Sequence, residues 1–276
     1  MFSRRALLAS LPAAALAALR SRLTIGVMDG ITGHASDPAS VAVAASLGFE
    51  GLQVTLGRRT PDGPLLLSDP ELQSRFLAES RRLRLPLVST YLDILHVHCL
   101  KNDPAALPLA AEAVAVTRRL GAPILMLVFF GPCALESRAD MDAVAGPLKE
   151  LAREAEKARV TLGFENTIRA ADDLRILDAV GSRALKIYYD IGNATNLYGA
   201  DPPAEIRILG RGRICQFHFK DKGYLGEGKV DVAAALRAIA AIGWQGAIVL
   251  ETGSPSQDRQ ADLRRNLAYL APLLGR

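Results

Sequence analysis

The chain has 276 residues, half of them hydrophobic, and this length suits one α/β barrel domain. The formal net charge is +4, but the first 22 residues carry four arginines and no acidic residue, which leaves 29 basic and 29 acidic residues in the rest. A body with balanced charge excludes a nucleic-acid binder that relies on a general electrostatic footprint.

The N-terminal segment 1–22 has the pattern of a signal peptide. The pair Arg4 and Arg5 precedes an apolar run of alanine and leucine, and an A-x-A cleavage option begins at Ala15. Paired arginines favour twin-arginine export, and the apolar run is short of the roughly 20 residues that a spanning helix needs. We therefore expect a periplasmic protein without stable membrane association, whose folded domain covers 23–276. The alternative is an amphipathic N-terminal helix on a cytoplasmic protein.

A repeated unit follows, in which a short β-branched apolar run, a loop and a helical stretch alternate. Near-continuous apolar strands that alternate with helices indicate a parallel sheet covered on both faces. Eight such units in this length predict a single closed (β/α)₈ barrel. A doubly wound open sheet is the alternative, weakened because no G-x-G-x-x-G follows the first strand. The predicted strands are 23–28, 51–56, 85–91, 123–130, 160–165, 185–190, 214–219 and 247–251.

The three cysteines are Cys99, Cys133 and Cys215. Their odd number and wide spacing predict neither a disulfide framework nor a zinc knuckle. We expect all three to be small buried hydrophobic residues.

Four consecutive strands end in side chains that can bind a metal. In order these are Glu165, Asp190, His218 and Glu251, and each interrupts or ends an apolar run. Because the C-terminal ends of barrel strands share one rim, we expect the four to converge. Three carboxylates and one imidazole suit one divalent cation, with Mn²⁺ or Mg²⁺ favoured and Fe²⁺, Co²⁺ or Zn²⁺ as alternatives.

The motifs around these residues, "FEN", "YYDIGN", "FHFKD" and "LET", resemble the xylose-isomerase-like barrel superfamily of sugar phosphate isomerases and epimerases. The resemblance implies that Glu165, Asp190, His218 and Glu251 bind one metal ion, with Mn²⁺ the first expectation. It also implies that Glu165 and Glu251 are the catalytic acid–base pair.

The substrate-holding positions differ from those of the ketose 3-epimerases of that superfamily. Asn193 replaces a histidine after the sixth strand, and Lys220 or Lys222 takes the place of an arginine after the seventh. All three can still hydrogen-bond a sugar. His96 and His98, two residues apart after the third strand, line the pocket, hold a second metal or are ordinary loop residues. We take Asn193, Lys220, Lys222 and His98 as the substrate-binding candidates.

Two further positions have a predicted place. Gln53, on the second strand, either reaches the pocket rim or caps a loop. Trp244 precedes the last strand and is expected to pack in the core at the opposite end of the barrel.

The sequence thus predicts a metal-dependent sugar or sugar phosphate isomerase or epimerase that moves a proton next to a carbonyl through an enediolate. A lyase or dehydratase of keto-sugars or cyclitols on the same site is the first alternative. A sugar-binding barrel without turnover is the second. The expected partner is a small carbohydrate, and a homo-oligomer is compatible with the sequence.

Overall fold

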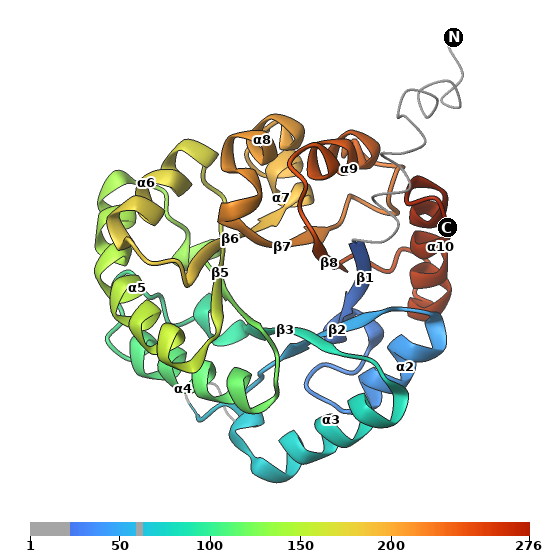
Figure 1. The fold of residues 1–276 in the computed structure, drawn as a ribbon, viewed down its shortest axis with the longest axis horizontal. Coiled ribbons are helices and arrows are strands. Elements are labelled where there is room, and N and C mark those ends of the chain that lie inside the picture. Colours follow the sequence, from blue (N-terminus) through green and yellow to red (C-terminus); the bar gives the residue numbers. More distant parts are fainter. Residues whose placement is uncertain (1–22, 59–62) are drawn as a thin grey trace.

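The computed structural model describes residues 23–58 and 63–276, so the predicted signal segment lies outside the described residues. Eight parallel strands close into one barrel in sequence order, with β1 paired to β8 (Figure 1). The predicted (β/α)₈ barrel is confirmed. The strands are β1 (Leu23–Met28), β2 (Gly51–Thr55), β3 (Leu87–Leu92), β4 (Ile124–Val128), β5 (Thr161–Glu165), β6 (Leu185–Asp190), β7 (Ile214–Phe219) and β8 (Gly246–Leu250).

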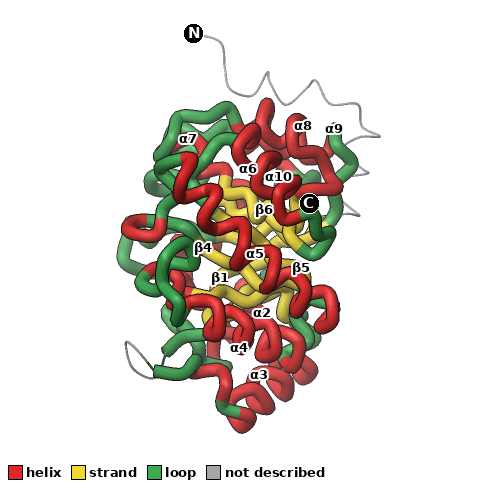
Figure 2. The backbone as a smooth tube through the Cα atoms, turned by 90° about the vertical axis from the view of Figure 1, so that its left-hand side faces the viewer, coloured by secondary structure: helices red, strands yellow, loops and turns green. Residues whose placement is uncertain are grey.

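Helices form the outer layer and enclose the strands, as the side view in Figure 2 shows. In the described part of the chain, no helix combines the length and apolar character needed to cross a bilayer. The α-helices are α2 (Ala39–Leu47), α3 (Pro70–Leu83), α4 (Ala106–Arg119), α5 (Arg138–Ala158), α6 (Ala170–Val180), α7 (Ile191–Asn196), α8 (Pro202–Arg213), α9 (Val232–Ala241) and α10 (Arg259–Leu273). Short 3₁₀ helices are η2 (Asp29–Thr32), η3 (Leu66–Ser68), η4 (Asp93–His96) and η5 (Gly131–Cys133).

Local signals in the sequence set where helices begin. Asp69 caps α3 by accepting from the backbone N–H of Glu71, with a proline in the first turn. Ser137 and Asp140 form a reciprocal capping box at the start of α5. These caps satisfy N–H groups that a helix leaves free, so each helix starts at a defined distance from the strand before it.

The alternation of β7 separates its two faces. Phe217 packs edge-on against Trp244 in the layer outside the sheet, and the Trp244 indole donates to the carbonyl of Ile214 at 3.0 Å. Trp244 is therefore core packing at the amino-terminal end of the barrel, as predicted. Because side chains alternate along a strand, His218 points the other way, into the barrel interior.

The cysteine prediction is wrong for one pair. Cys99 and Cys133 form a disulfide, whereas Cys215 keeps a free thiol. Cys99 lies beyond η4 and Cys133 ends η5, in the loops that follow the neighbouring strands β3 and β4. Parallel pairing of those strands brings the two loops together, a proximity that a spacing of 34 residues does not reveal.

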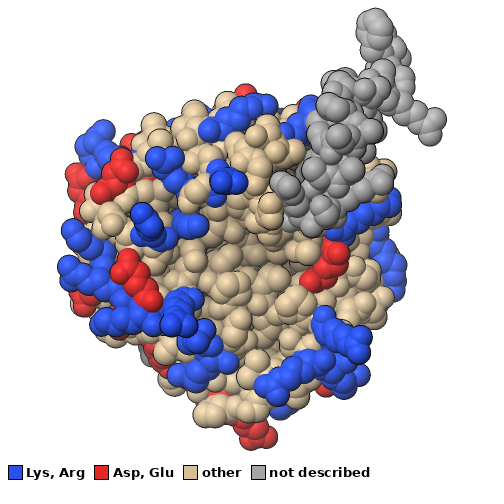
Figure 3. Space-filling view, viewed as in Figure 1, with Lys and Arg blue, Asp and Glu red and all other residues tan. Residues whose placement is uncertain are grey.

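The charged side chains lie around the barrel rather than over its centre on the face drawn in Figure 3. Lysine and arginine, with fewer acidic residues, surround a hollowed centre of uncharged residues. A cavity of about 460 Å³ lies at the amino-terminal end of the strands, lined among others by Ile124, Thr161, Lys186 and Trp244. It contains none of the four predicted metal ligands.

Candidate metal centre

The four strand-end residues converge, as predicted. One ligand atom from each of Glu165, Asp190, His218 and Glu251 lies within 4.8 Å of the others. Glu165 and Asp190 are the last residues of β5 and β6, and Glu251 directly follows β8. Asp190 and His218 face each other in the register between β6 and β7. The geometry needed for one shared cation is therefore present.

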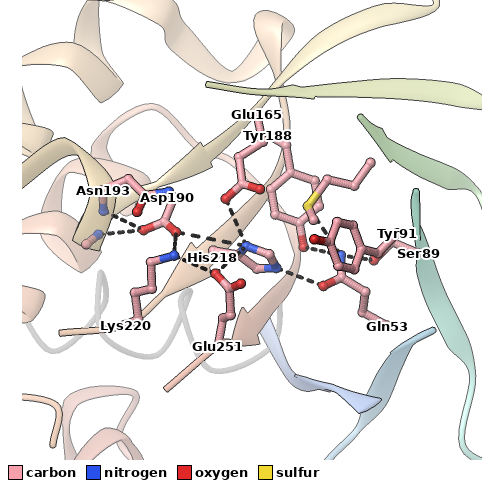
Figure 4. A network of polar contacts seen from close by, with 12 residues as sticks. Gln53, Ser89, Tyr91, Glu165, Tyr188, Asp190, Asn193, His218, Lys220 and Glu251 are labelled. Atoms are coloured by element: carbon pink, nitrogen blue, oxygen red, sulfur yellow. Dashed lines mark hydrogen bonds and ion pairs between the residues drawn. The ribbon is translucent and has the colours of Figure 1, made fainter. Parts of the chain in front are cut away.

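The imidazole of His218 is the centre of the cluster (Figure 4). Its Nδ1 lies 3.1 Å from Oε1 of Glu165, 3.2 Å from Oε2 of Glu251 and 4.0 Å from Oδ2 of Asp190. His218, Asp190 and Glu165 are buried, while the Glu251 side chain is 25% exposed. Glu251 thus forms the side of the cluster that is open to an arriving molecule.

The two carboxylate oxygens of Asp190 have different partners. Oδ1 accepts from the backbone N–H groups of Gly192 and Asn193 at 2.7 and 2.9 Å and so caps α7. Oδ2 faces the cluster and forms an ion pair with the Lys220 ammonium at 2.8 Å, but it accepts no well-aligned hydrogen bond from the described residues. A buried oxygen with this incomplete coordination is what a metal ligand requires, and the mainly oxygen donor set fits a hard divalent cation.

Lys220 directly follows β7, which ends at Phe219, and it lies two positions after His218, so the alternation of the strand directs its side chain to the same inner side. Its ammonium lies 2.8 Å from Asp190 and 2.7 Å from Oε2 of Glu251. Three carboxylates in a buried site repel one another unless cations are near. Lys220 supplies one fixed positive charge and leaves negative charge for a second cation.

Burial and the neighbouring charges move the pKa values of the two glutamates in opposite directions. Burial, opposed by His218, raises the pKa of Glu165. For Glu251 burial acts in the same sense, but the positive charges of His218 and Lys220 outweigh it and lower the pKa. A pair of carboxylates with divergent pKa values is the arrangement that acid–base catalysis uses.

The same charges keep His218 protonated without a metal. Burial lowers the pKa of His218, but Glu251 and Glu165 outweigh that effect and raise it to about 10. The proton on Nδ1 then occupies the position of a cation, and a metal ion must displace it.

Gln53 lies neither at the rim nor on a loop, so both expectations for it are wrong. Its side chain is fully buried inside the barrel, and its Oε1 lies 2.8 Å from Nε2 of His218. Tyr188 packs edge-on against the imidazole, with ring centroids 4.5 Å apart. Sequence reasoning missed Tyr188, although its inward direction follows from its place two residues before Asp190.

An aromatic group lies beside the cluster. The Tyr91 hydroxyl and Nε2 of His96 are 2.6 Å apart, and His96 stacks on Phe130 with centroids 5.9 Å apart. Burial, together with the charges of Glu251 and Glu165, raises the pKa of Tyr91. Tyr91 and Phe130 were not predicted, because strand aromatics alone do not distinguish a pocket wall from a core.

The structure separates the four substrate-binding candidates. Lys220 reaches the cluster, and Asn193 is buried in the first turn of α7, where its backbone N–H contacts Asp190. Lys222 is exposed, and its backbone N–H donates to the carboxylate of Asp221. His98 pairs through Nδ1 with Asp103 at 2.6 Å.

Asp221, one of the charged residues that follow β7, has a structural role. Its buried carboxylate accepts from the backbone N–H groups of Lys222, Lys229 and Val230. These bonds fold the loop between β7 and α9 back on itself. The role of Asp221 is thus to shape the loop beside the cluster.

Comparison with known proteins agrees with this geometry. Residues 41–273 match the family model described as a xylose isomerase-like TIM barrel. No curated protein is similar enough in sequence to count as a match.

Several solved structures share the barrel. A D-allulose 3-epimerase from Methylomonas sp. is 20% identical with a TM-score of 0.73, over 91% of this chain and 98% of that one. An L-ribulose 3-epimerase is 20% identical with a TM-score of 0.75, over 91% and 94%. The 3-keto-D-glucoside 4-epimerase from E. coli is 17% identical with a TM-score of 0.72, over 91% and 100%. At these identities the likeness shows a common fold. With the family model matched over most of its length, the chain belongs to the xylose isomerase-like TIM barrel family.

Proposed function

We propose that this protein is a divalent-metal-dependent isomerase or epimerase of a sugar or sugar phosphate. The observation that carries the proposal is the approach of Glu165 and Glu251 to one atom, Nδ1 of His218, at 3.1 and 3.2 Å from different strands. Two carboxylates of unlike pKa next to one cation site suit proton transfer at a carbon beside a carbonyl.

The two glutamates divide the proton transfer. Glu251 is held ionised by His218 and Lys220 and lies at the open side, so it is the base that takes the proton from carbon. Glu165, whose pKa burial raises, is the acid that returns a proton. Return to the opposite face of the same carbon inverts it, and return to the adjacent carbon gives an aldose–ketose isomerisation. The reverse reaction exchanges the roles.

Glu165, Asp190, His218 and Glu251 are the residues that would hold the cation. When bound, the metal polarises the carbonyl and the neighbouring hydroxyl of the substrate and so stabilises the enediolate. The three carboxylates favour Mn²⁺ or Mg²⁺, with Co²⁺, Fe²⁺ and Zn²⁺ as alternatives.

A carbohydrate substrate is supported by the groups around the open side of the cluster. We assign Lys220 and Asn193 to hold substrate oxygens on one side of the cluster, and Tyr91, on the opposite side of His218, to offer an aromatic face. Lys222 and His98 remain candidates for contacts further out. The solved structures that share the barrel include enzymes named for allulose, ribulose and a 3-keto-glucoside, which supports the same substrate class.

Export to the periplasm is part of the proposal. The paired Arg4 and Arg5 ahead of an apolar run support twin-arginine transport. The disulfide between Cys99 and Cys133 supports it independently, because disulfides persist in oxidising compartments such as the periplasm.

Elemental analysis of the purified protein, followed by incubation with ketoses and keto-glycosides in deuterated water, tests this function. We expect about one divalent metal ion per chain and deuterium at one substrate carbon, with the epimer or isomer as product. Irreversible release of water identifies the lyase instead. Sugar binding without exchange identifies a barrel that lacks turnover. A protein that binds no metal and exchanges no deuterium overturns the proposal.

A further inference from the structure

The two ring nitrogens of His218 face different chemical surroundings. Nδ1 faces the carboxylates of Glu165 and Glu251, and Nε2 faces Oε1 of Gln53 at 2.8 Å. Because neutral imidazole carries its proton on only one nitrogen, only the form protonated on Nε2 leaves a lone pair on Nδ1 for a metal. The atom of Gln53 that meets Nε2 therefore decides whether the ring can be a ligand.

The surroundings of Gln53 settle which end of its amide that is. Its Nε2 lies 3.1 Å from the Ser89 hydroxyl, 3.0 Å from the Tyr188 hydroxyl and 3.6 Å from the sulfur of Met126 (Figure 4). Hydroxyls donate or accept and so accommodate either end of an amide. A thioether sulfur carries no hydrogen and only accepts. The amide nitrogen thus belongs on the Met126 side, and the carbonyl oxygen belongs on the His218 side.

The backbone brings Gln53 to this position from the other side of the barrel. The register of β2 against β3 shifts between Leu52 and Gln53, which places Gln53 opposite Ser89. The extra residue is Val88 on β3, and the shift brings the side chains of Gln53 and Ser89 level with each other. Tyr188 packs edge-on against the His218 ring. This contact fixes the ring orientation in which Nδ1 faces the carboxylates and Nε2 faces Gln53.

From this arrangement we propose that Gln53 is a positioning residue for the metal site. Its carbonyl oxygen accepts the proton of His218 Nε2 and thereby presents the lone pair of Nδ1 to the cation. The inference rests on the proposed metal-dependent function. It adds a residue 165 positions away in sequence that contacts the predicted ligand His218 directly.

Titration of Mn²⁺ into the metal-free wild type and three variants tests the proposal. Gln53→Leu removes the acceptor at nearly constant volume and should weaken Mn²⁺ binding about 10- to 100-fold, the usual effect of losing such a partner. Gln53→Glu keeps an oxygen in place and should retain most of the affinity. Gln216→Leu is the matched control, because Gln216 is an equally buried glutamine on the strand of His218 whose own Oε1 has no partner among the described residues. It should bind Mn²⁺ within about threefold of wild type.

A second measurement reads the hydrogen bond in protein saturated with a diamagnetic cation, Mg²⁺ or Zn²⁺, because the metal-free imidazolium carries a proton on both nitrogens. In ¹⁵N-labelled wild type, the Nε2–H of His218 should exchange slowly with solvent, and this signal should be lost in Gln53→Leu. It also decides the case in which Gln53→Leu does not fold, since the wild-type spectrum alone shows which nitrogen is protonated. An unprotonated Nε2 overturns the proposal.

The two proposals fail differently. Wild type that binds Mn²⁺ no more tightly than Gln53→Leu, while exchanging substrate deuterium, overturns the role of Gln53 alone. Equal weakening in Gln53→Leu and Gln216→Leu also overturns it, because any buried change would then suffice. Wild type that binds no divalent cation overturns the metal-dependent function, and with it the role of Gln53 toward a metal.

Discussion

Lys220 lies so close to Gly192 that only glycine fits at position 192, in the first turn of α7. A β-carbon on Gly192 would lie 2.5 Å from Cγ of Lys220 and 2.6 Å from its carbonyl oxygen. The backbone of Gly192 also donates to Asp190. This approach holds the Lys220 ammonium between the carboxylates of Asp190 and Glu251.

Gly192→Ala is therefore expected to displace Lys220. Alanine within a helix normally stabilises by about 0.5–1 kcal/mol relative to glycine, but overpacking here should cost about 1–3 kcal/mol and lower turnover as well. Denaturant unfolding followed by the fluorescence of Trp244, the only tryptophan, measures the first effect. Gly212→Ala is the control, because a β-carbon at Gly212 in α8 meets nothing within 4 Å. A Gly192→Ala protein as stable and active as wild type would contradict the assignment.

Glu251→Gln should abolish proton transfer and leave the fold intact. The amide is nearly isosteric but cannot accept a proton from carbon, so deuterium incorporation should fall about 10²- to 10⁴-fold. Substrate exchange followed by mass spectrometry reports the loss, and the unfolding midpoint reports the fold. Glu150→Gln, on the exposed side of α5, should behave as wild type. Activity retained in Glu251→Gln would remove Glu251 from the reaction.

Asp29 predicts a pH dependence of stability that is independent of the metal centre. Its fully buried carboxylate accepts from two backbone N–H groups and the Thr55 hydroxyl, yet burial raises its pKa from 3.8 to about 6. Between these two pH values the native state holds the proton more tightly than the unfolded chain. The contribution of Asp29 to stability therefore falls as pH rises through this window, by about 3 kcal/mol in total.

Comparison with Asp29→Asn isolates the contribution of Asp29 to the pH dependence of stability. Asparagine does not titrate, and the contributions of all other titrating groups are the same in both proteins and cancel in the difference. The free energy of unfolding of wild type minus that of Asp29→Asn should decrease between pH 4 and pH 7. Guanidinium unfolding at the two pH values provides the numbers. A difference that stays constant or grows with pH would show that burial does not control this carboxylate.

Reduction of the Cys99–Cys133 disulfide should destabilise the protein. Closing a loop of 34 residues corresponds to about 3–4 kcal/mol in the chain-entropy account. Thiol titration of the unfolded protein should find one reactive thiol before reduction and three afterwards, since Cys215 is free. Cys215→Ser should leave the effect of reductant unchanged. Three reactive thiols in protein purified without reductant would contradict the pairing.

The strands and the convergence of the four candidate ligands were predictable from sequence for a simple reason. Apolar runs and helix caps are local patterns, and parallel strands in a barrel bring all their C-terminal ends to one rim. Glu165, Asp190 and His218 could thus be placed near one another without any knowledge of distances. The inward direction of Lys220 follows from its place two residues after His218, but its contact with both Asp190 and Glu251 was more difficult to predict, because it depends on the distances between three strand ends.

Only the tertiary structure decided which residues meet across the barrel and between loops. Gln53 meets His218 because closure of the sheet pairs β1 with β8 and so brings β2 and β7 to the same barrel interior. Cys99 meets Cys133 because neighbouring strands carry their loops together. Such pairs depend on the closure and tilt of the whole sheet, and these are set by the packing of all eight strands rather than by any local pattern.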